Sequence, residues 1–326
     1  MKSNRSKLRR RVGIALFAVV VLLNVSAFFQ ARSMTVYGPP GARTDAPEAL
    51  GFAGKLSAVL FGVRIPRPQV TDTPERHGWP SETRVIPTPD GGRIEGWFVP
   101  HAAPRGLVVI APGYAASRSD FLPAVDSWRR IGFSCFVFDF RGAGGSSGNV
   151  TTAGAREAED VRLVLDHARA QLLRPGQKVA VYGYSMGGAA ALRAAAGEGF
   201  APDALVAVAV YDRMLDTVRG RFHAMGLPAS PASELMVFWG GVQQGFNGFA
   251  QNPADFARRV RVPTLVLQGG DDARAPPANG RAIHDALAGP KALHIFPDGN
   301  HVNITGGDRQ AWIDAVNGIL RVAGFP

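Results

Sequence analysis

The feature that most constrains this chain is a Gly-Tyr-Ser-Met-Gly turn at residues 183–187, which directly follows the apolar run at residues 179–182. A strand that leads through G-x-S-x-G into a helix holds the central serine on a tight, strained turn. The residues two before and two after that serine must be small, because a side chain there would meet the neighbouring chain. The turn therefore predicts that Ser185 presents its hydroxyl at the carboxyl edge of a parallel sheet.

Apolar runs with strand character alternate with helical segments around this turn. We expect strands at residues 84–87, 93–100, 107–111, 133–140, 179–182, 204–210, 264–267 and 292–296. We expect helices at residues 119–131, 155–171, 186–196, 280–287 and 309–322. Nearly continuous apolar strands separated by helices predict an α/β fold with a mostly parallel, doubly wound sheet covered on both faces. Ligands of such sheets bind beyond the carboxyl ends of the strands.

One segment interrupts this alternation. Residues 212–252 are rich in Gly, Met, Phe and Trp and contain no clear strand. An insertion of this length after a strand end predicts a short helical lid over the site, which would supply an apolar substrate wall. A pair of ordinary packing helices is the alternative.

The N-terminus predicts an attachment to a membrane. Residues 1–11 are basic, and residues 12–29 are almost unbroken apolar sequence, about 27 Å long as a helix and just sufficient to cross a bilayer core. We expect an uncleaved single-pass anchor with the following domain on the extracytoplasmic side, because positive flanks stay in the cytoplasm. The alternative is a signal peptide cleaved after Val25-Ser26-Ala27, which would release a secreted or periplasmic protein. Residues 30–81 read as a proline-rich tether and domain edge, and residues 82–326 as the globular domain.

The charge distribution argues against a nucleic-acid partner. The net charge is +10, but six positive charges lie in residues 1–11, and no basic stripe interleaved with aromatic residues follows. Arginine heavily outnumbers lysine, and this bias with abundant Ala and Gly suggests a GC-rich bacterial genome. The single cysteine, Cys135, lies in an apolar run and is predicted to be a buried thiol rather than a nucleophile.

A serine nucleophile needs a base, and the base needs an orienting acid. His301 follows the last predicted strand, in a loop at the carboxyl edge of the sheet, and is the predicted base. The acid is expected in the loop after the strand at 264–267, where Asp271 and Asp272 are adjacent. We choose Asp272, with Asp271 as the alternative, because neighbouring side chains point in different directions and only one can contact His301.

Two backbone N–H groups are expected to bind the negatively charged oxygen that forms when a serine attacks a carbonyl. Met186 follows the serine at the start of a helix, where its N–H is free. Tyr114 follows Pro112-Gly113 just beyond the strand at 107–111, and the glycine is expected to allow close approach of the backbone. These residues predict an oxyanion hole formed by the N–H groups of Met186 and Tyr114.

These motifs together resemble the α/β-hydrolase superfamily over roughly residues 82–326. Ser185, Asp272 and His301 follow the family's order, and residues 139–146 match its D-x-R-G-x-G-x-S turn. The chain resembles in particular bacterial membrane-anchored hydrolases of the serine-aminopeptidase-like and esterase-like branch. One departure is Pro112-Gly113, where the family often has His-Gly, so the support of the oxyanion loop differs.

The resemblance implies a serine hydrolase that cleaves a carboxylic ester or thioester through an acyl-enzyme. The alternatives are a serine peptidase acting on amides and a catalytically silent scaffold for protein interaction. The glycine-rich residues 142–147 mimic a dinucleotide fingerprint, but the third glycine is displaced and the following acidic residue is missing. No paired Cys/His spacing or phosphate-binding loop is present, so we expect neither a cofactor nor a metal. The expected partners are a small ester or peptide-like substrate and the membrane.

Overall fold

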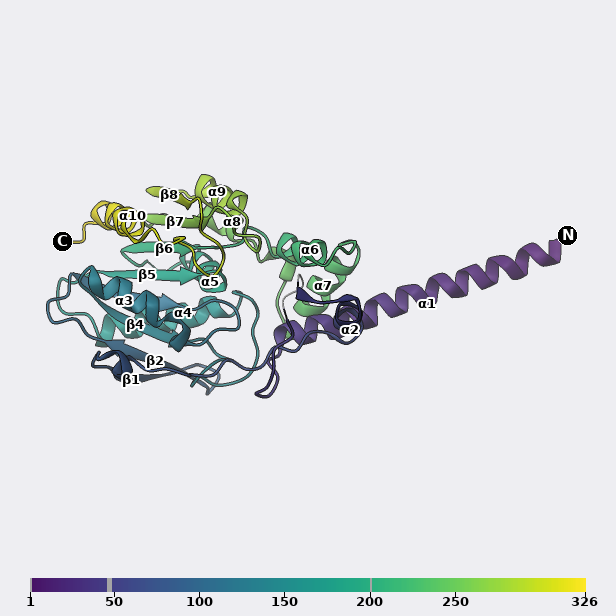
Figure 1. Ribbon diagram of the computed structural model, residues 1–326, viewed down its shortest axis with the longest axis horizontal. Coiled ribbons are helices and arrows are strands. Elements are labelled where there is room, and N and C mark those ends of the chain that lie inside the picture. The colour runs from purple at the N-terminus through teal and green to yellow at the C-terminus, as the bar shows by residue number, and fades with distance from the viewer. Residues whose placement is uncertain (1, 46–48, 200) are drawn as a thin grey trace.

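A computed structural model describes residues 2–45, 49–199 and 201–326 of the chain. Residues 46–48 of the predicted tether thus lie outside the described part. The centre of the molecule is an eight-stranded sheet with the strand order β1-β2-β4-β3-β5-β6-β7-β8 (Figure 1). The strands are β1 (Glu82–Pro87), β2 (Arg93–Val99), β3 (Gly106–Ala111), β4 (Phe133–Asp139), β5 (Val179–Tyr184), β6 (Ala204–Val208), β7 (Thr264–Gly269) and β8 (Lys291–Phe296).

The sheet is mostly parallel, as predicted. Strands β1 and β2 form an antiparallel hairpin around Asp90-Gly91-Gly92, and β2 pairs antiparallel with β4. All other pairings are parallel. Strand β3 lies between β4 and β5, so the strand order reverses there and the connections leave on opposite faces. Such a reversal opens a crevice at the carboxyl ends of the strands.

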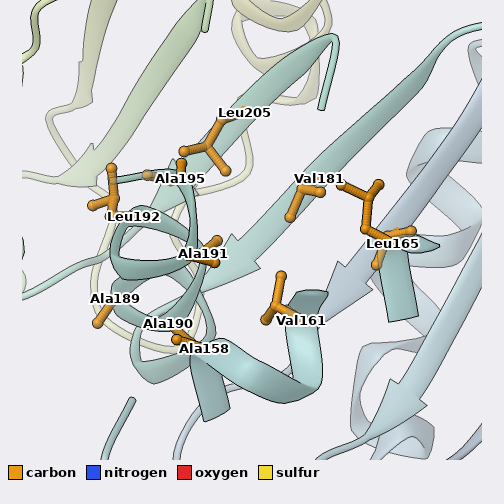
Figure 2. Packing of buried hydrophobic residues seen from close by; sticks show 14 of the residues in the cluster. Ala158, Val161, Leu165, Val181, Ala189, Ala190, Ala191, Leu192, Ala195 and Leu205 are labelled. Atoms are coloured by element: carbon orange, nitrogen blue, oxygen red, sulfur yellow. The ribbon is translucent and has the colours of Figure 1, made fainter. Parts of the chain in front are cut away.

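Helices cover both faces of the sheet and divide the hydrophobic core into two layers. One layer is formed by α4 (Glu157–Gln171), α5 (Met186–Ala195), α8 (Pro253–Ala257) and α9 (Pro277–Ala286). The other layer is formed by α3 (Leu122–Arg130) and α10 (Arg309–Val322). Figure 2 shows α5 against the sheet: most of its buried residues are small, such as Ala189, Ala190 and Ala191, and they lie in one cluster with Val161 of α4 and Val181 of β5. Small side chains let α5 lie directly on the strand that carries the serine turn.

Two predicted helices begin differently from expectation. The helix predicted at residues 119–131 starts as a single 3₁₀ turn at Arg118–Phe121 and continues as α3. Helix α9 begins at Pro277, three residues before the predicted start, because proline is well placed at the first helical position, where no N–H partner is needed.

The N-terminal helix α1 is longer than the apolar run that predicted it. It runs without interruption over Lys2–Thr35, and its N-terminal part projects from the rest of the molecule as a straight rod (Figure 1). Its segment from Ser6–Thr35 is long and apolar enough to cross a membrane, with a mean hydropathy of 2.6 in its most apolar window. The tether after it contains α2 (Phe52–Phe61) and a 3₁₀ turn at Pro74–His77.

The predicted lid segment contains α6 (Met214–Ala224), α7 (Ala232–Gln244) and a 3₁₀ turn at Gly248–Ala250. These helices pack on the end of α1 rather than on the sheet (Figure 1). Trp239 Nε1 lies 3.3 Å from Asn24 Oδ1, and Gln243 Nε2 donates to the Phe28 carbonyl at 2.8 Å. The end of the N-terminal helix and the lid therefore form one structural unit above the carboxyl edge of the sheet.

Candidate active site

The serine turn has the strained geometry that the motif predicts. Ser185 has φ 50° and ψ −112°, a conformation that non-glycine residues rarely adopt. Its N–H donates to the Val208 carbonyl at the end of β6 at 2.7 Å, which holds the turn against the next strand. Strain of this kind persists only where the surroundings force it, and it is typical of functional sites.

The two glycines of the motif are required by space. A methyl group at Gly183 would lie 2.7 Å from the Gly187 carbonyl oxygen, and one at Gly187 would lie 2.2 Å from the Ala111 oxygen. Both distances are far below van der Waals contact. The turn therefore accepts no side chain at these positions, which agrees with the reason given for small residues at both sites.

The structure brings His301 and Asp272 into direct contact. His301 Nδ1 lies 2.8 Å from Asp272 Oδ2, and the carboxylate is buried. The other carboxylate oxygen, Oδ1, accepts from the N–H groups of Arg274 at 2.9 Å and Ala275 at 2.8 Å. The neighbouring Asp271 is exposed, so Asp272 and not Asp271 is the carboxylate that contacts the imidazole.

The sequence did not reveal the partner that holds the histidine loop. Tyr184, the residue before the serine, donates its hydroxyl to the His301 carbonyl at 2.6 Å. Burial raises the pKa of Tyr184, and the nearby Asp272 raises it further, so the phenol stays protonated and remains a donor. One turn thus positions both the serine and the backbone of the predicted base.

Ser185 and His301 line the same cavity, which has a volume of about 1560 Å³. The Ser185 hydroxyl makes no hydrogen bond with the described residues, as is common before a substrate aligns the two groups. The lid and the N-terminal helices supply much of the apolar wall. These residues are Met34, Leu50, Ala58, Val218, Phe222, Met225 and Met236.

The backbone N–H groups of Met186 and Tyr114 are both free to bind an oxyanion. Neither donates to another described segment, and Met186 is the first residue of α5. The loop before Tyr114 lies against the serine turn, since a methyl group at Gly113 would lie 3.8 Å from Ser185 Cβ. That distance is an ordinary contact, so the loop approaches the serine turn without a steric requirement for glycine at residue 113.

The support for the Tyr114 loop comes from the end of α1. Tyr114 donates its hydroxyl to the Met34 carbonyl at 2.6 Å, and burial raises the pKa of this phenol to about 12. The next residue, Ala115, has φ 54° and donates its N–H to the Tyr37 hydroxyl at 3.2 Å. The chain that leaves the N-terminal helix therefore supports the loop of Tyr114, and sequence reasoning missed it because these residues are about 80 positions apart.

The remaining candidates of the sequence serve the structure. Asp139 is buried and accepts from the N–H groups of Arg118 at 2.6 Å and Gly145 at 2.9 Å, so it occupies the glycine-rich loop that resembles a dinucleotide fingerprint. Cys135 is buried, and burial raises the pKa of its thiol. In the described part of the chain, no cluster of three His, Cys, Asp or Glu side chains could hold a metal ion.

Comparisons with known proteins agree with this fold. A family model described as serine aminopeptidase, S33, matches residues 102–215. The uncharacterized protein YfhR of Escherichia coli K12 is 26% identical over 231 residues, which cover 69% of this chain and 75% of the relative. The uncharacterized membrane protein YNL320W of Saccharomyces cerevisiae is 25% identical, over 71% of this chain and 76% of the relative.

Solved esterases share the fold. The Pyrococcus furiosus esterase Pf2001 superposes with a TM-score of 0.66 at 22% identity, covering 78% of this chain and 96% of the esterase. The esterase EaEST of Exiguobacterium antarcticum gives a TM-score of 0.55 at 18% identity, covering 73% and 99%.

The eight-stranded, mostly parallel sheet and its serine turn define an α/β-hydrolase fold, and the chain is a hydrolase. It resembles the serine-aminopeptidase-like and esterase-like serine hydrolases of the α/β-hydrolase superfamily.

Proposed function

We propose that the chain hydrolyses a carboxylic ester or thioester through an acyl-enzyme formed on Ser185. The observation that carries this proposal is the buried Asp272–His301 pair, which lies at the same cavity as a serine on a strained turn. In this scheme Asp272 keeps the proton on His301 Nδ1, so that Nε2 is free to accept the serine proton.

The reaction has two halves. Ser185 Oγ attacks the carbonyl carbon while its proton passes to His301, and the N–H groups of Met186 and Tyr114 bind the developing oxyanion. The tetrahedral intermediate then expels the alcohol, which takes the proton from His301 and leaves the acyl group on Ser185. Water repeats the sequence, giving up a proton to His301, and releases the carboxylic acid and the free serine.

The lid favours an ester over a peptide with a free amino terminus. A peptidase of that kind needs an available carboxylate to bind the ammonium group. Asp216 and Glu234 of the lid instead both pair with Arg219, at 3.0 and 2.7 Å. Asp212 is partly buried, and burial raises the pKa of its carboxyl, which weakens it as a partner for a cation. The apolar wall of the cavity suits a hydrocarbon acyl chain.

We expect the full-length protein, purified in detergent, to react with a fluorophosphonate probe and to hydrolyse 4-nitrophenyl esters. The ester rates should exceed those for aminoacyl 4-nitroanilides, because the lid offers no free carboxylate for the amino group. Intact mass measures how many probe molecules label each protein molecule. Steady-state rates on the two substrate series compare ester with anilide hydrolysis. A protein that the probe does not label is not a serine hydrolase with an accessible Ser185. If the anilides are cleaved faster than the esters, the proposed activity is that of a peptidase rather than an esterase.

We also propose that α1 remains attached as a single-pass anchor, with the hydrolase domain on the extracytoplasmic side. The signal-peptide alternative would cut after Ala27, yet Ala27 is only 3% exposed and lies within a helix that continues to Thr35. Apolar side chains beside α1 are also exposed where a membrane surface would meet them. These are Phe52 and Leu56 of α2 and Phe238 and Val242 of α7.

The anchor predicts a specific fractionation result. We expect the protein to stay in carbonate-washed membranes and its intact mass to include the segment before Phe28. Protease added outside the cytoplasm should digest the hydrolase domain, because the basic N-terminal residues hold the other end inside. A soluble protein whose N-terminus is Phe28 would establish cleavage and exclude the anchor.

A further inference from the structure

Four arginines reach the cavity from different parts of the chain, and one of them, Arg309, lies at the start of α10. Arg43 comes from the tether, Arg221 from α6 and Arg274 from the loop after β7, and all three line the cavity that contains Ser185. None of the three forms an ion pair with a carboxylate among the described residues. By contrast, Arg118 and Arg141 are each held by two or more carboxylates.

Arg221 lies next to the predicted oxyanion loop. Its Nη1 is 3.3 Å from Met34 Sδ, and its guanidinium carbon is 5.8 Å from the centre of the Tyr114 ring. The Arg221 side chain is exposed to the cavity, but desolvation by the surrounding lid still lowers its pKa; Tyr114 opposes this shift, and the charges of Arg274 and Arg43 lower the pKa further. The three cations are therefore close enough to repel one another.

The carboxylates around the cavity do little to balance these charges. Asp126 pairs with Arg130 at 2.7 Å, Asp216 pairs with Arg219 at 3.0 Å, and Asp120 accepts from the Ser117 N–H at 2.8 Å. Asp45 is the lining carboxylate without such a partner among the described residues. The three arginine side chains are exposed to the cavity, and like charges that share one cavity are unfavourable unless an anion joins them.

We infer that the substrate of this cavity is an ester that carries an anionic group, bound by Arg221 together with Arg43 and Arg274. The inference rests on the proposed function, since Ser185 would attack the ester carbonyl of the same molecule. A carboxylate and a phosphate share the required chemistry, because both accept paired hydrogen bonds from a guanidinium. The apolar wall would hold the hydrocarbon part, so the substrate class is an anionic amphiphile.

Matched esters test this directly on the full-length protein in a neutral detergent. One substrate is 4-nitrophenyl hexanoate, and its partners have a carboxylate or a phosphate at the end of the same six-carbon acyl chain. We expect the wild type to have a higher kcat/KM for the anionic esters. Arg221→Ala should lower kcat/KM by about 10- to 100-fold for the anionic esters and by less than twofold for the neutral ester. The two anionic arms distinguish a carboxylate ligand from a phosphate ligand.

Two variants control for damage to the lid. Arg221→Lys keeps the charge but loses the paired geometry, so it should recover part of the anionic preference. Arg213→Ala removes an exposed arginine at the start of α6, paired with Asp255 at 3.4 Å, and should leave the preference unchanged. A preference that Arg221→Ala does not alter, or an equal loss on neutral and anionic esters, overturns the inference while the esterase proposal stands.

A binding measurement separates the inference from the proposed function. Hexyl phosphate should raise the melting temperature of the wild type more than hexanol does, and Arg221→Ala should remove the difference. If no ester is hydrolysed but hexyl phosphate still stabilises the wild type through Arg221, the esterase proposal fails and the anion site remains. If hexyl phosphate gives no added stabilisation, the anion site is excluded.

Discussion

The Ser185→Ala variant is expected to lose ester hydrolysis by a factor on the order of 10⁴ to 10⁶ in kcat. Ser185 is the one serine, threonine or cysteine of the turn at residues 183–187, so removal of its hydroxyl leaves no nucleophile there to form the acyl-enzyme. The free N–H groups of Met186 and Tyr114 would remain, and they account for the small residual rate over water. The burst of 4-nitrophenol that reports acyl-enzyme formation should disappear together with fluorophosphonate labelling.

The fold should survive this substitution. The Ser185 hydroxyl makes no hydrogen bond with the described residues, so alanine removes no structural contact, and the melting temperature should change little. Ser127→Ala is a matched control, because Ser127 lies on α3 and its hydroxyl bonds only to the Pro123 carbonyl. Labelling that persists in Ser185→Ala, or is lost in Ser127→Ala, would contradict the assignment of the nucleophile.

The sequence pattern predicted those parts of the fold that depend on local chemistry. Apolar runs of strand length stand out because both faces of a parallel sheet are buried, so all eight strands were recognised within a few residues. The serine turn is equally local. Gly183 and Gly187 are required by close contacts within the strand–turn–helix unit and with the adjacent β3. His301 and Asp272 were found because parallel strands end at one edge of the sheet, where the structure brings the two side chains together.

What the sequence did not predict depends on contacts between distant segments. Nothing in the apolar pattern of the N-terminus indicates that Met34 and Tyr37 hold the loop of Tyr114, because a membrane-spanning run is read by hydropathy and not by its partners. For the same reason the sequence did not predict that Arg43, Arg221 and Arg274 line one cavity. Each of them lies in a segment whose local sequence gives no sign of the other two. Hydrogen bonds and like charges across the tertiary fold carry no periodic signal in the chain.

The geometry around Asp272 gives the second large expected effect. Asp272 Oδ1 accepts from the N–H groups of Arg274 and Ala275, and Oδ2 faces His301 Nδ1. In an Asp272→Asn variant the two backbone donors require an acceptor at the Oδ1 position, so the amide oxygen settles there. The amide nitrogen then faces His301 and donates to Nδ1. The proton of the imidazole moves to Nε2, which leaves that nitrogen unable to accept the proton of Ser185.

We therefore expect Asp272→Asn to lower kcat by about 10⁴-fold at neutral pH while the protein stays folded, because the buried amide keeps its backbone partners. Asp271→Asn is the matched control: the same change one residue earlier, on an exposed side chain, should alter kcat by less than twofold. The ester assay measures kcat for both variants, and melting curves show whether each variant is folded. A low kcat with an unchanged melting temperature indicates the wrong tautomer of His301 rather than loss of the fold. An equal loss in both variants would mean that the loop after β7 matters only for stability, and a larger loss in Asp271→Asn would transfer the role of the orienting acid to Asp271. The buried carboxylate and its two backbone donors argue for a loss confined to Asp272→Asn, since a group fixed from one side can dictate which nitrogen of His301 carries the proton.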